Sequence, residues 1–328
     1  MRTDAEPNLA SMSLRYFVDA LLEDLGQLVE LKQRKPRTLT QYFGIAHHYI
    51  VDLWERPVAA VTVDEVRRWH RACAVKARES GTPGTKSGTT MANRALMVLG
   101  LVFQRAEEDG AIPLGSSPTQ YVERFREIPR RRYLTPHELA EVWAAIERCE
   151  RRRVRKATRF DAPFVHSVTQ ALRLILLLAL RKEEALRLTW KQVDLRTRVI
   201  RLDDTKTGER EVPISTMAAQ LLHQQLRRHT SPWVFPSRGG RGPIRDVYAV
   251  WRMVLADCGL EAEEIVPHTA RHSMATLELQ AGRPVADVMA ILGHSNPNVT
   301  LNIYGRRLAT PGARATAERH GRRMRRAA

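Results

Sequence analysis

Two short stretches of alternating polar and apolar residues interrupt a chain whose other periodic segments have helical spacing. They occupy residues 198–202 and 210–214, and residues 203–209 between them contain Asp, Thr and Gly. This alternation predicts two strands that are joined as a β-hairpin. The sequence therefore predicts a mainly α-helical fold with a small β-hairpin or sheet, in which the domain that holds the hairpin is of the α+β class.

A stretch rich in structure-breaking residues separates two groups of helical segments. Residues 111–132 contain Pro, Gly and Ser and close on three consecutive arginines, which predicts a linker. After it, Thr135 and Glu138 have the spacing of a helix capping box, with Pro136 at the first helical position. We therefore expect five parts: an N-terminal extension at 1–12, a helical domain at 13–110, the linker at 111–132, an α+β domain at 133–310 and a basic tail at 311–328.

The chain is strongly basic, with a formal net charge of +17 over 328 residues. Residues 1–132 have 20 basic and 16 acidic side chains, whereas residues 133–328 have 33 and 20. Such a surplus predicts a polyanionic partner, most often nucleic acid, although a solvated basic surface is the simpler alternative.

Other sequence features narrow the class of protein. Apolar residues make up 43 %, which excludes a wholly disordered chain. The longest apolar run, residues 174–180, is far shorter than the roughly 20 residues that span a bilayer. The chain begins without a secretory leader pattern, so we expect a cytoplasmic protein with no membrane partner. The three cysteines match no metal spacing and predict reduced thiols, and we expect neither a metal nor a cofactor.

The second half of the chain contains five short motifs with residues that bind or transform phosphate groups. In order they are Arg181 with Glu184, Lys206 in the hairpin loop, His268-Thr269-Ala270-Arg271, Gly293-His294 and Tyr304. Each motif alone has little specificity. Their fixed order, with the lysine in the hairpin loop, is the specific signal.

This ordered set resembles the tyrosine recombinase (phage integrase) family. Residues 13–110 are similar to the family's helical core-binding domain, and residues 133–310 are similar to its catalytic domain. The resemblance implies a two-domain clamp on double-stranded DNA. It also implies a homotetramer on synapsed sites, formed from protomers that are monomeric or weakly associated off DNA, in a nucleoid-associated protein. The tail is expected to dock on a neighbouring protomer.

The resemblance implies covalent catalysis by Tyr304, which would attack a DNA phosphodiester and form a 3′-phosphotyrosyl link. A phenol ordinarily titrates near pH 10, so this nucleophile needs nearby positive charge or a base. Lys206 would be the general acid that protonates the 5′ leaving oxygen.

The remaining site residues would bind the phosphate. Arg181 and Arg271 would clamp its non-bridging oxygens, because a guanidinium is always charged and donates two parallel hydrogen bonds. His268 would orient the phosphate and exchange a proton with Tyr304, and His294 would donate a hydrogen bond. Glu184 is expected to orient Arg181 rather than to catalyse.

The sequence departs from the family pattern close to Arg181. Glycine usually stands two residues before this arginine, and Ala179 occupies the position here. We expect the loss of glycine to change the backbone around Arg181. The departure removes none of the six candidate catalytic side chains.

Two other functions compete with a site-specific recombinase. A type IB topoisomerase would use the same tyrosine chemistry without synapsis of specific sites, and would relax any supercoiled plasmid as a monomer. A DNA-binding regulator would keep the scaffold without strand cleavage, which the complete motif set disfavours. For a recombinase, we expect integration and excision of a mobile element, with resolution of chromosome dimers as the alternative role.

Overall fold

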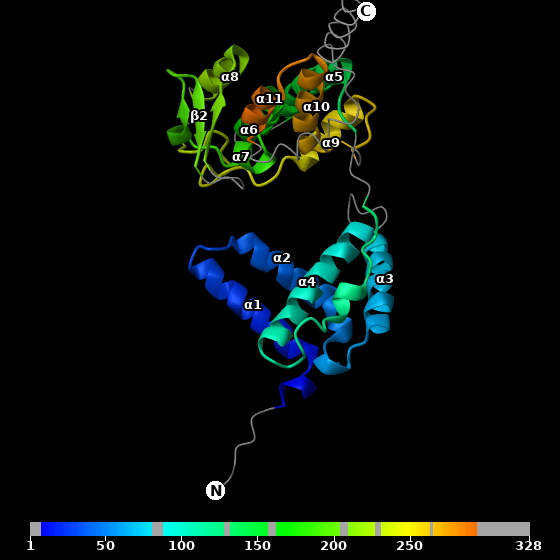
Figure 1. The fold of residues 1–328 in the computed structure, drawn as a ribbon. Helices are drawn as coiled ribbons and strands as arrows, with labels where there is room; N and C mark the ends of the chain where they lie inside the picture. The colour runs from blue at the N-terminus through cyan, green and yellow to red at the C-terminus, as the bar shows by residue number, and fades with distance from the viewer. Residues whose placement is uncertain are drawn as a thin grey trace, which may run out of the picture. The chain divides into compact units, whose positions relative to one another are not determined.

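The computed structural model describes residues 8–80, 88–127, 132–156, 162–203, 209–226, 231–262 and 265–293. The chain divides into two compact units, Met1–Pro129 and Arg130–Ala328 (Figure 1). The predicted fold class is confirmed, because the described residues are mainly helical and form a small antiparallel sheet in the second unit.

The described part of the first unit contains four α-helices and four short 3₁₀ turns. The helices are α1 (Leu14–Glu30), α2 (Pro36–His48), α3 (Val63–Glu79) and α4 (Thr89–Glu108), and the turns are Leu9–Ser11, Ile50–Leu53, Val58–Ala60 and Pro118–Tyr121. Helix α4 contacts the other three helices. Its apolar residues recur at helical spacing and are buried, among them Leu99 and Phe103. Helix α4 is therefore the centre of this unit.

Much of the predicted linker belongs to the first unit instead. Ile112 and Val122 are buried in the core of that unit. The Asn93 side chain of α4 donates from Nδ2 to the Phe125 carbonyl at 2.8 Å and accepts from the Phe125 N–H at 3.0 Å. The described part of the predicted linker, residues 111–127, therefore packs on the first unit. Pro, Gly and Ser marked turns correctly, but these turns pack on α4.

The second unit contains the remaining described elements. Its helices are α5 (Pro136–Lys156), α6 (Ala162–Leu178), α7 (Lys182–Leu186), α8 (Thr216–Leu226), α9 (Tyr248–Asp257), α10 (Pro267–Gln280) and α11 (Val285–Leu292). The predicted capping box at the start of α5 is present: the Glu138 carboxylate accepts from the Thr135 N–H at 2.8 Å, and the Glu138 N–H donates to Thr135 Oγ1 at 3.2 Å.

The predicted hairpin is confirmed and has one additional strand. Strands β2 (Val199–Leu202) and β3 (Arg210–Pro213) are antiparallel, with Leu202 opposite Arg210 at the mouth of the loop. A two-residue strand, β1 (Val193–Asp194), pairs with the other edge of β2, giving the order β1-β2-β3. The sequence did not reveal β1 because two residues are too few to establish an alternating pattern.

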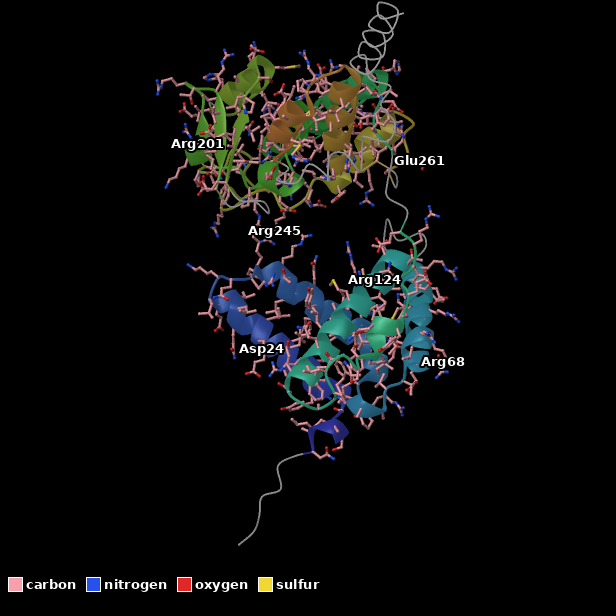
Figure 2. All side chains as sticks on the ribbon, viewed as in Figure 1. Asp24, Arg68, Arg124, Arg201, Arg245 and Glu261 are labelled. Atoms are coloured by element: carbon pink, nitrogen blue, oxygen red, sulfur yellow. The ribbon has the colours of Figure 1, made fainter. Side chains whose placement is uncertain are left out.

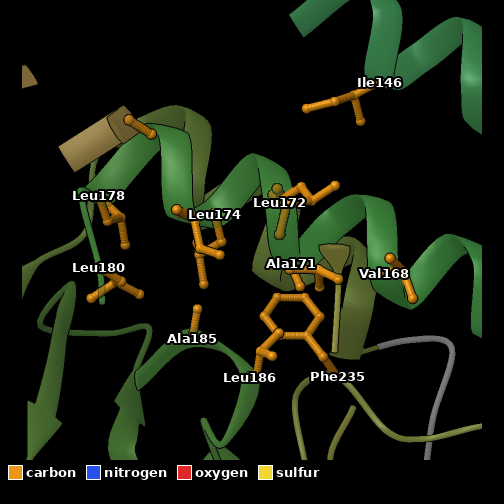
Figure 3. Close-up of a cluster of buried hydrophobic side chains, with 14 of the residues drawn as sticks. Ile146, Val168, Ala171, Leu172, Leu174, Leu178, Leu180, Ala185, Leu186 and Phe235 are labelled. Atoms are coloured by element: carbon orange, nitrogen blue, oxygen red, sulfur yellow. The ribbon is translucent and has the colours of Figure 1, made fainter. Parts of the chain in front are cut away.

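Helix α6 lies in the core of the second unit. Its residues Leu172, Leu174 and Leu178 are buried with Leu186 of α7 and with Phe235, whose ring lies below the helix in Figure 3. This apolar packing fixes the C-terminal end of α6, where the chain turns toward Arg181. Among the described residues, no helix combines the length and apolar character that would span a membrane. The three cysteines are free thiols, and Cys73 and Cys149 are buried.

Candidate functional site

Three arginine side chains meet at the C-terminal end of α11. Each donates to a different one of three consecutive main-chain carbonyls there: Arg210 Nη1 to Ile291 at 2.6 Å, Arg271 Nη2 to Leu292, and Arg181 Nη2 to Gly293 at 3.3 Å. The last carbonyls of a helix have no partners within it and carry partial negative charge. The end of α11 therefore gathers guanidinium groups from three separate elements: α10, β3 and the residue that precedes α7.

Arg271 is almost fully enclosed, with 2 % of the residue exposed. It projects from α10, and its Nη1 donates to the Ala179 carbonyl at 2.9 Å while Nη2 donates to Leu292. Both acceptors are carbonyls at helix ends, of α6 and of α11. A buried guanidinium is tolerated only where acceptors replace water, and these two carbonyls do so.

Arg181 occupies the N-cap position of α7 and is paired with Glu184 in the first turn. The Arg181 N–H donates to Glu184 Oε2 at 2.8 Å, and Arg181 Nη1 donates to Oε1 at 2.7 Å. Burial raises the pKa of Glu184, but hydrogen bonds and positive charge from Arg181 and Arg210 outweigh it, so this pKa lies below its usual value. Glu184 thus orients Arg181, as its spacing predicts, and leaves 22 % of the Arg181 side chain exposed.

Ala179 adopts the backbone conformation that glycine favours. Its φ is +50°, in the left-handed region, and its side chain is fully buried. For an L-residue this conformation costs roughly 1–2 kcal/mol. Glycine would adopt this conformation without that cost. The chain makes the left-handed turn with alanine, and Arg271 binds the carbonyl that this turn presents.

The structure explains why the Gly293-His294 motif has glycine at its first position. Its φ is +61°, where it ends α11 in the left-handed conformation. A Cβ atom at this position would overlap Cδ of Arg210. Glycine is therefore required both by the backbone and by the arginine packed against it.

His268 and Arg271 lie one turn apart on α10, with different surroundings. His268 is the second residue of the helix and is exposed, whereas Arg271 is buried. The His268 ring makes an edge-to-face contact with His272, their centroids 4.7 Å apart. Burial, with the nearby charge of Arg271, lowers the pKa of His272. His272 therefore tends to be neutral beside the arginine cluster.

Sequence reasoning missed Arg210. Its side chain is buried and donates from Nη2 to Glu184 Oε2 at 2.6 Å. A signal was present, because Arg210 and Val212 are two residues apart on one strand and so share a face. Val212 is in the core, and an arginine on that face needs a buried acceptor.

The other three candidate residues lie outside the described residues. Lys206 falls within 204–208, between the ends of β2 and β3, and His294 directly follows Gly293. Tyr304 lies in 294–328, as does the predicted basic tail. Within the described parts of the chain, no group of His, Cys, Asp and Glu side chains is arranged to hold a metal ion.

The family of the chain follows from comparison with known proteins. The model of the Phage integrase family matches residues 132–310, more than half of the chain, and the chain therefore belongs to this family. The tyrosine recombinase XerD of Vibrio cholerae is 30 % identical over 140 residues, which are 39 % of this chain and 46 % of that protein. The chain thus matches about half the length of this relative.

Solved structures extend the likeness of fold to both units. A Tn1549 transposon integrase in complex with a circular intermediate DNA has a TM-score of 0.68 at 20 % identity, covering 94 % of this chain and 99 % of that chain. A lambda integrase tetramer bound to a Holliday junction has a TM-score of 0.69 at 16 % identity, covering 92 % and 80 %. At these identities the comparison establishes the integrase fold.

Proposed function

We propose that the protein is a site-specific recombinase that cleaves and rejoins DNA strands through a 3′-phosphotyrosyl intermediate. The observation that carries the proposal is the meeting of Arg181, Arg210 and Arg271 at the end of α11, in the unit that matches the phage integrase family. Together with the Glu184 carboxylate, these side chains carry a net positive charge. Partial burial strengthens the attraction of such a cluster for a phosphodiester.

In the proposed reaction Tyr304 Oη attacks the scissile phosphorus, so that a phosphorus–tyrosine oxygen bond forms and the bond to the 5′ oxygen breaks. His268 accepts the phenol proton, and Lys206 supplies a proton to the leaving 5′ oxygen. The phosphotyrosyl link conserves the energy of the broken bond. Attack by another 5′-hydroxyl then rejoins a strand and releases Tyr304.

The phosphate-binding roles fall to Arg181, Arg271 and His294. Arg181 is the partly exposed arginine, and it would contact a non-bridging oxygen directly. Arg271 is almost fully enclosed, and it would add its positive charge near the second oxygen as the phosphorane forms. His294 would donate to the same phosphate, because it directly follows Gly293, the residue that ends α11.

Chain connectivity supports the assignment of Lys206. It is four residues from Leu202 and four from Arg210, the pair that closes the mouth of the hairpin. Lys206 therefore belongs to the loop that rejoins the sheet at Arg210, whose guanidinium contacts Glu184.

The proposed partner is double-stranded DNA, bound by a core-binding domain at 13–110 and a catalytic domain at 133–310. We propose a homotetramer on two synapsed sites, formed from protomers that associate weakly off DNA. The lambda integrase structure, a tetramer on a Holliday junction, supports this assembly by analogy of fold. The transposon integrase supports integration and excision of a mobile element as the biological role, on DNA of the nucleoid.

Covalent trapping tests the proposal. Nicked suicide duplexes with the junction sequences that flank the gene in its host are incubated with the protein, alongside fragments covering the host genome. Products are resolved on a denaturing gel. We expect a protein-linked DNA band with the wild type and none with Tyr304→Phe, which should still bind the same duplex. A band retained by Tyr304→Phe would refute the nucleophile.

Two other outcomes would replace the proposal. Specific binding of a duplex without any covalent band, also when the site is supercoiled, would favour the non-cleaving regulator. Relaxation of any supercoiled plasmid by monomers would favour a type IB topoisomerase.

A further inference from the structure

Arg210 is the first residue of β3 and lies where the hairpin loop rejoins the sheet. Only 7 % of its side chain is exposed. Its two terminal nitrogens bind acceptors on different elements: Nη2 binds Glu184 in α7 at 2.6 Å, and Nη1 binds the Ile291 carbonyl of α11 at 2.6 Å. One side chain therefore connects the sheet to both α7 and α11.

The Glu184 contact links Arg210 to Arg181 through one carboxylate. Glu184 Oε2 accepts from Arg210 Nη2 and from the Arg181 N–H, while Oε1 accepts from Arg181 Nη1. A carboxylate with both oxygens engaged has a fixed orientation. The position of the Arg181 guanidinium is thereby tied to the mouth of the hairpin.

The contact of Arg210 with the end of α11 is also tightly packed. Cδ of Arg210 lies so close to Gly293 that a Cβ atom there would overlap it. Gly293 is the last residue before His294 in the sequence. The same side chain therefore lies against the point from which the segment with His294 and Tyr304 continues.

Stability alone does not account for this arginine. Burial lowers the pKa of Arg210, and its Nε is buried without a hydrogen-bond partner among the described residues. Well-packed apolar residues often replace buried ion pairs at no cost in stability. The unsatisfied Nε and the cost of desolvation point to a gain elsewhere, in the alignment of three elements.

We propose that Arg210 is a positioning residue for strand cleavage, whose guanidinium holds the mouth of the β2–β3 hairpin on Glu184 and on the end of α11. This inference rests on the proposed function. Through this anchor, the loop that contains the proposed general acid begins at a fixed place beside the phosphate-binding arginines. Arg210 acts through Lys206 and need not touch the DNA.

The test uses a leaving group that needs no acid. A duplex on which the wild type forms the covalent complex is made in two versions, one with the normal phosphodiester and one with a 5′-bridging phosphorothiolate at the cut. Single-turnover cleavage rates are measured at saturating protein. We expect Arg210→Ala to slow cleavage of the normal duplex by about 10²-fold. On the phosphorothiolate its rate should lie within about threefold of the wild type, as for Lys206→Ala.

Arg201→Ala is the matched control. Arg201 lies on the adjacent strand, is 53 % exposed and donates to Glu211 Oε1 at 3.1 Å (Figure 2). Its loss removes the same charge from the same sheet, and we expect cleavage of both duplexes to stay unchanged. Arg210→Lys keeps the charge but cannot reach both acceptors in the same geometry, so it should show a milder form of the same pattern. If thermal melting shows that Arg210→Ala is unfolded, Arg210→Lys is used for the test in its place.

The failures are distinguishable. If Arg210→Ala slows both duplexes equally, or slows neither, Arg210 does not align the acid and this inference is wrong, while the proposed function stands. If Lys206→Ala is not rescued by the phosphorothiolate, the general acid has been misassigned and the inference falls with it. If no host fragment gives a covalent complex with the wild type, both the function and the inference are overturned.

Discussion

In the first unit one arginine lies between two carboxylates, whereas in the second unit one carboxylate lies between two arginines. Arg105 of α4 donates from Nε to Asp109 at 2.8 Å and from Nη1 to Asp24 of α1, which is labelled in Figure 2. The Arg105 side chain is 27 % exposed. This arrangement uses all of the arginine's charge internally and ties α1 to α4.

Glu184 has the opposite surroundings, because Arg181 donates to its Oε1 and Arg210 donates to its Oε2. Arg271 donates to the nearby Leu292 carbonyl at the end of α11. At Arg105 two carboxylates contact one guanidinium, whereas at Glu184 two guanidinium groups contact one carboxylate. The local excess is therefore acidic in the first unit and basic in the second, and a basic excess is what the proposed phosphate binding requires. The following predictions test this difference, from the largest expected effect to the smallest.

Arg271→Ala and Arg105→Ala should differ sharply in stability. Removing Arg271 leaves the buried carbonyls of Ala179 and Leu292 without their donor, which we expect to cost about 3–5 kcal/mol. Removing the partly exposed Arg105 should cost about 1 kcal/mol or less. Hydrogen exchange resolved by peptide measures each unit separately. Equal losses of protection in the two variants would contradict the comparison.

Gly293→Ala should destabilise the second unit by about 2–4 kcal/mol, from a left-handed alanine and from overlap with Arg210. In the double variant with Arg210→Ala, the overlap disappears and only the backbone cost remains. Denaturant unfolding of the four proteins in this cycle gives the coupling energy. Strict additivity would show that Arg210 does not pack against Gly293 in solution.

Glu184→Gln should cost about 2 kcal/mol at neutral pH, because hydrogen bonds to a charged group are lost. The pKa of Glu184 lies below its usual value near 4.5, so its carboxylate contributes stability above that pH. This contribution is lost as the pH falls through the folded-state pKa. Exchange protection of α7 should therefore decline in acid for the wild type, and less so for Glu184→Gln. Parallel declines would remove Glu184 as the cause.

Ala179→Gly should change stability by less than about 1 kcal/mol. Relief of the left-handed alanine favours glycine by roughly 1–2 kcal/mol. Loss of a buried methyl group and the greater entropy of unfolded glycine oppose it by a similar amount. Thermal melting of the variant measures the balance. A large destabilisation would mean that Ala179 matters for packing rather than for its turn.

Local patterns predicted the elements better than their packing. The alternation at 198–202 and 210–214 predicted the hairpin, and the spacing of Thr135 and Glu138 predicted the start of α5. The Pro, Gly and Ser residues in 111–127 predicted turns, but they did not predict that these turns pack on α4. Whether a turn packs on a helix depends on distant partners such as Asn93, and no local pattern contains that information.

The site was predicted in part, and for different reasons. Arg181 and Arg271 came from the order of motifs in a family, and the structure brings both to the end of α11. Glu184 came from helical spacing, which fixes neighbours one turn apart. Arg210 was not predicted as a site residue, because its acceptors lie 26 and 81 residues away in the sequence. The roles of all six candidate residues stay predictions that the cleavage experiments address: Arg181, Lys206, His268, Arg271, His294 and Tyr304.

The shared use of the α11 end has a consequence for how the protein is made. The arginine contacts there join positions separated by 21, 81 and 112 residues. Contacts of such long range form late, because much of the chain must be ordered before they close. During synthesis α11 is also the last of the described helices to leave the ribosome. A nascent or truncated chain that lacks α11 would lack the three carbonyls that bind Arg181, Arg210 and Arg271 together. The proposed strand cleavage would therefore stay silent until α11 has been made.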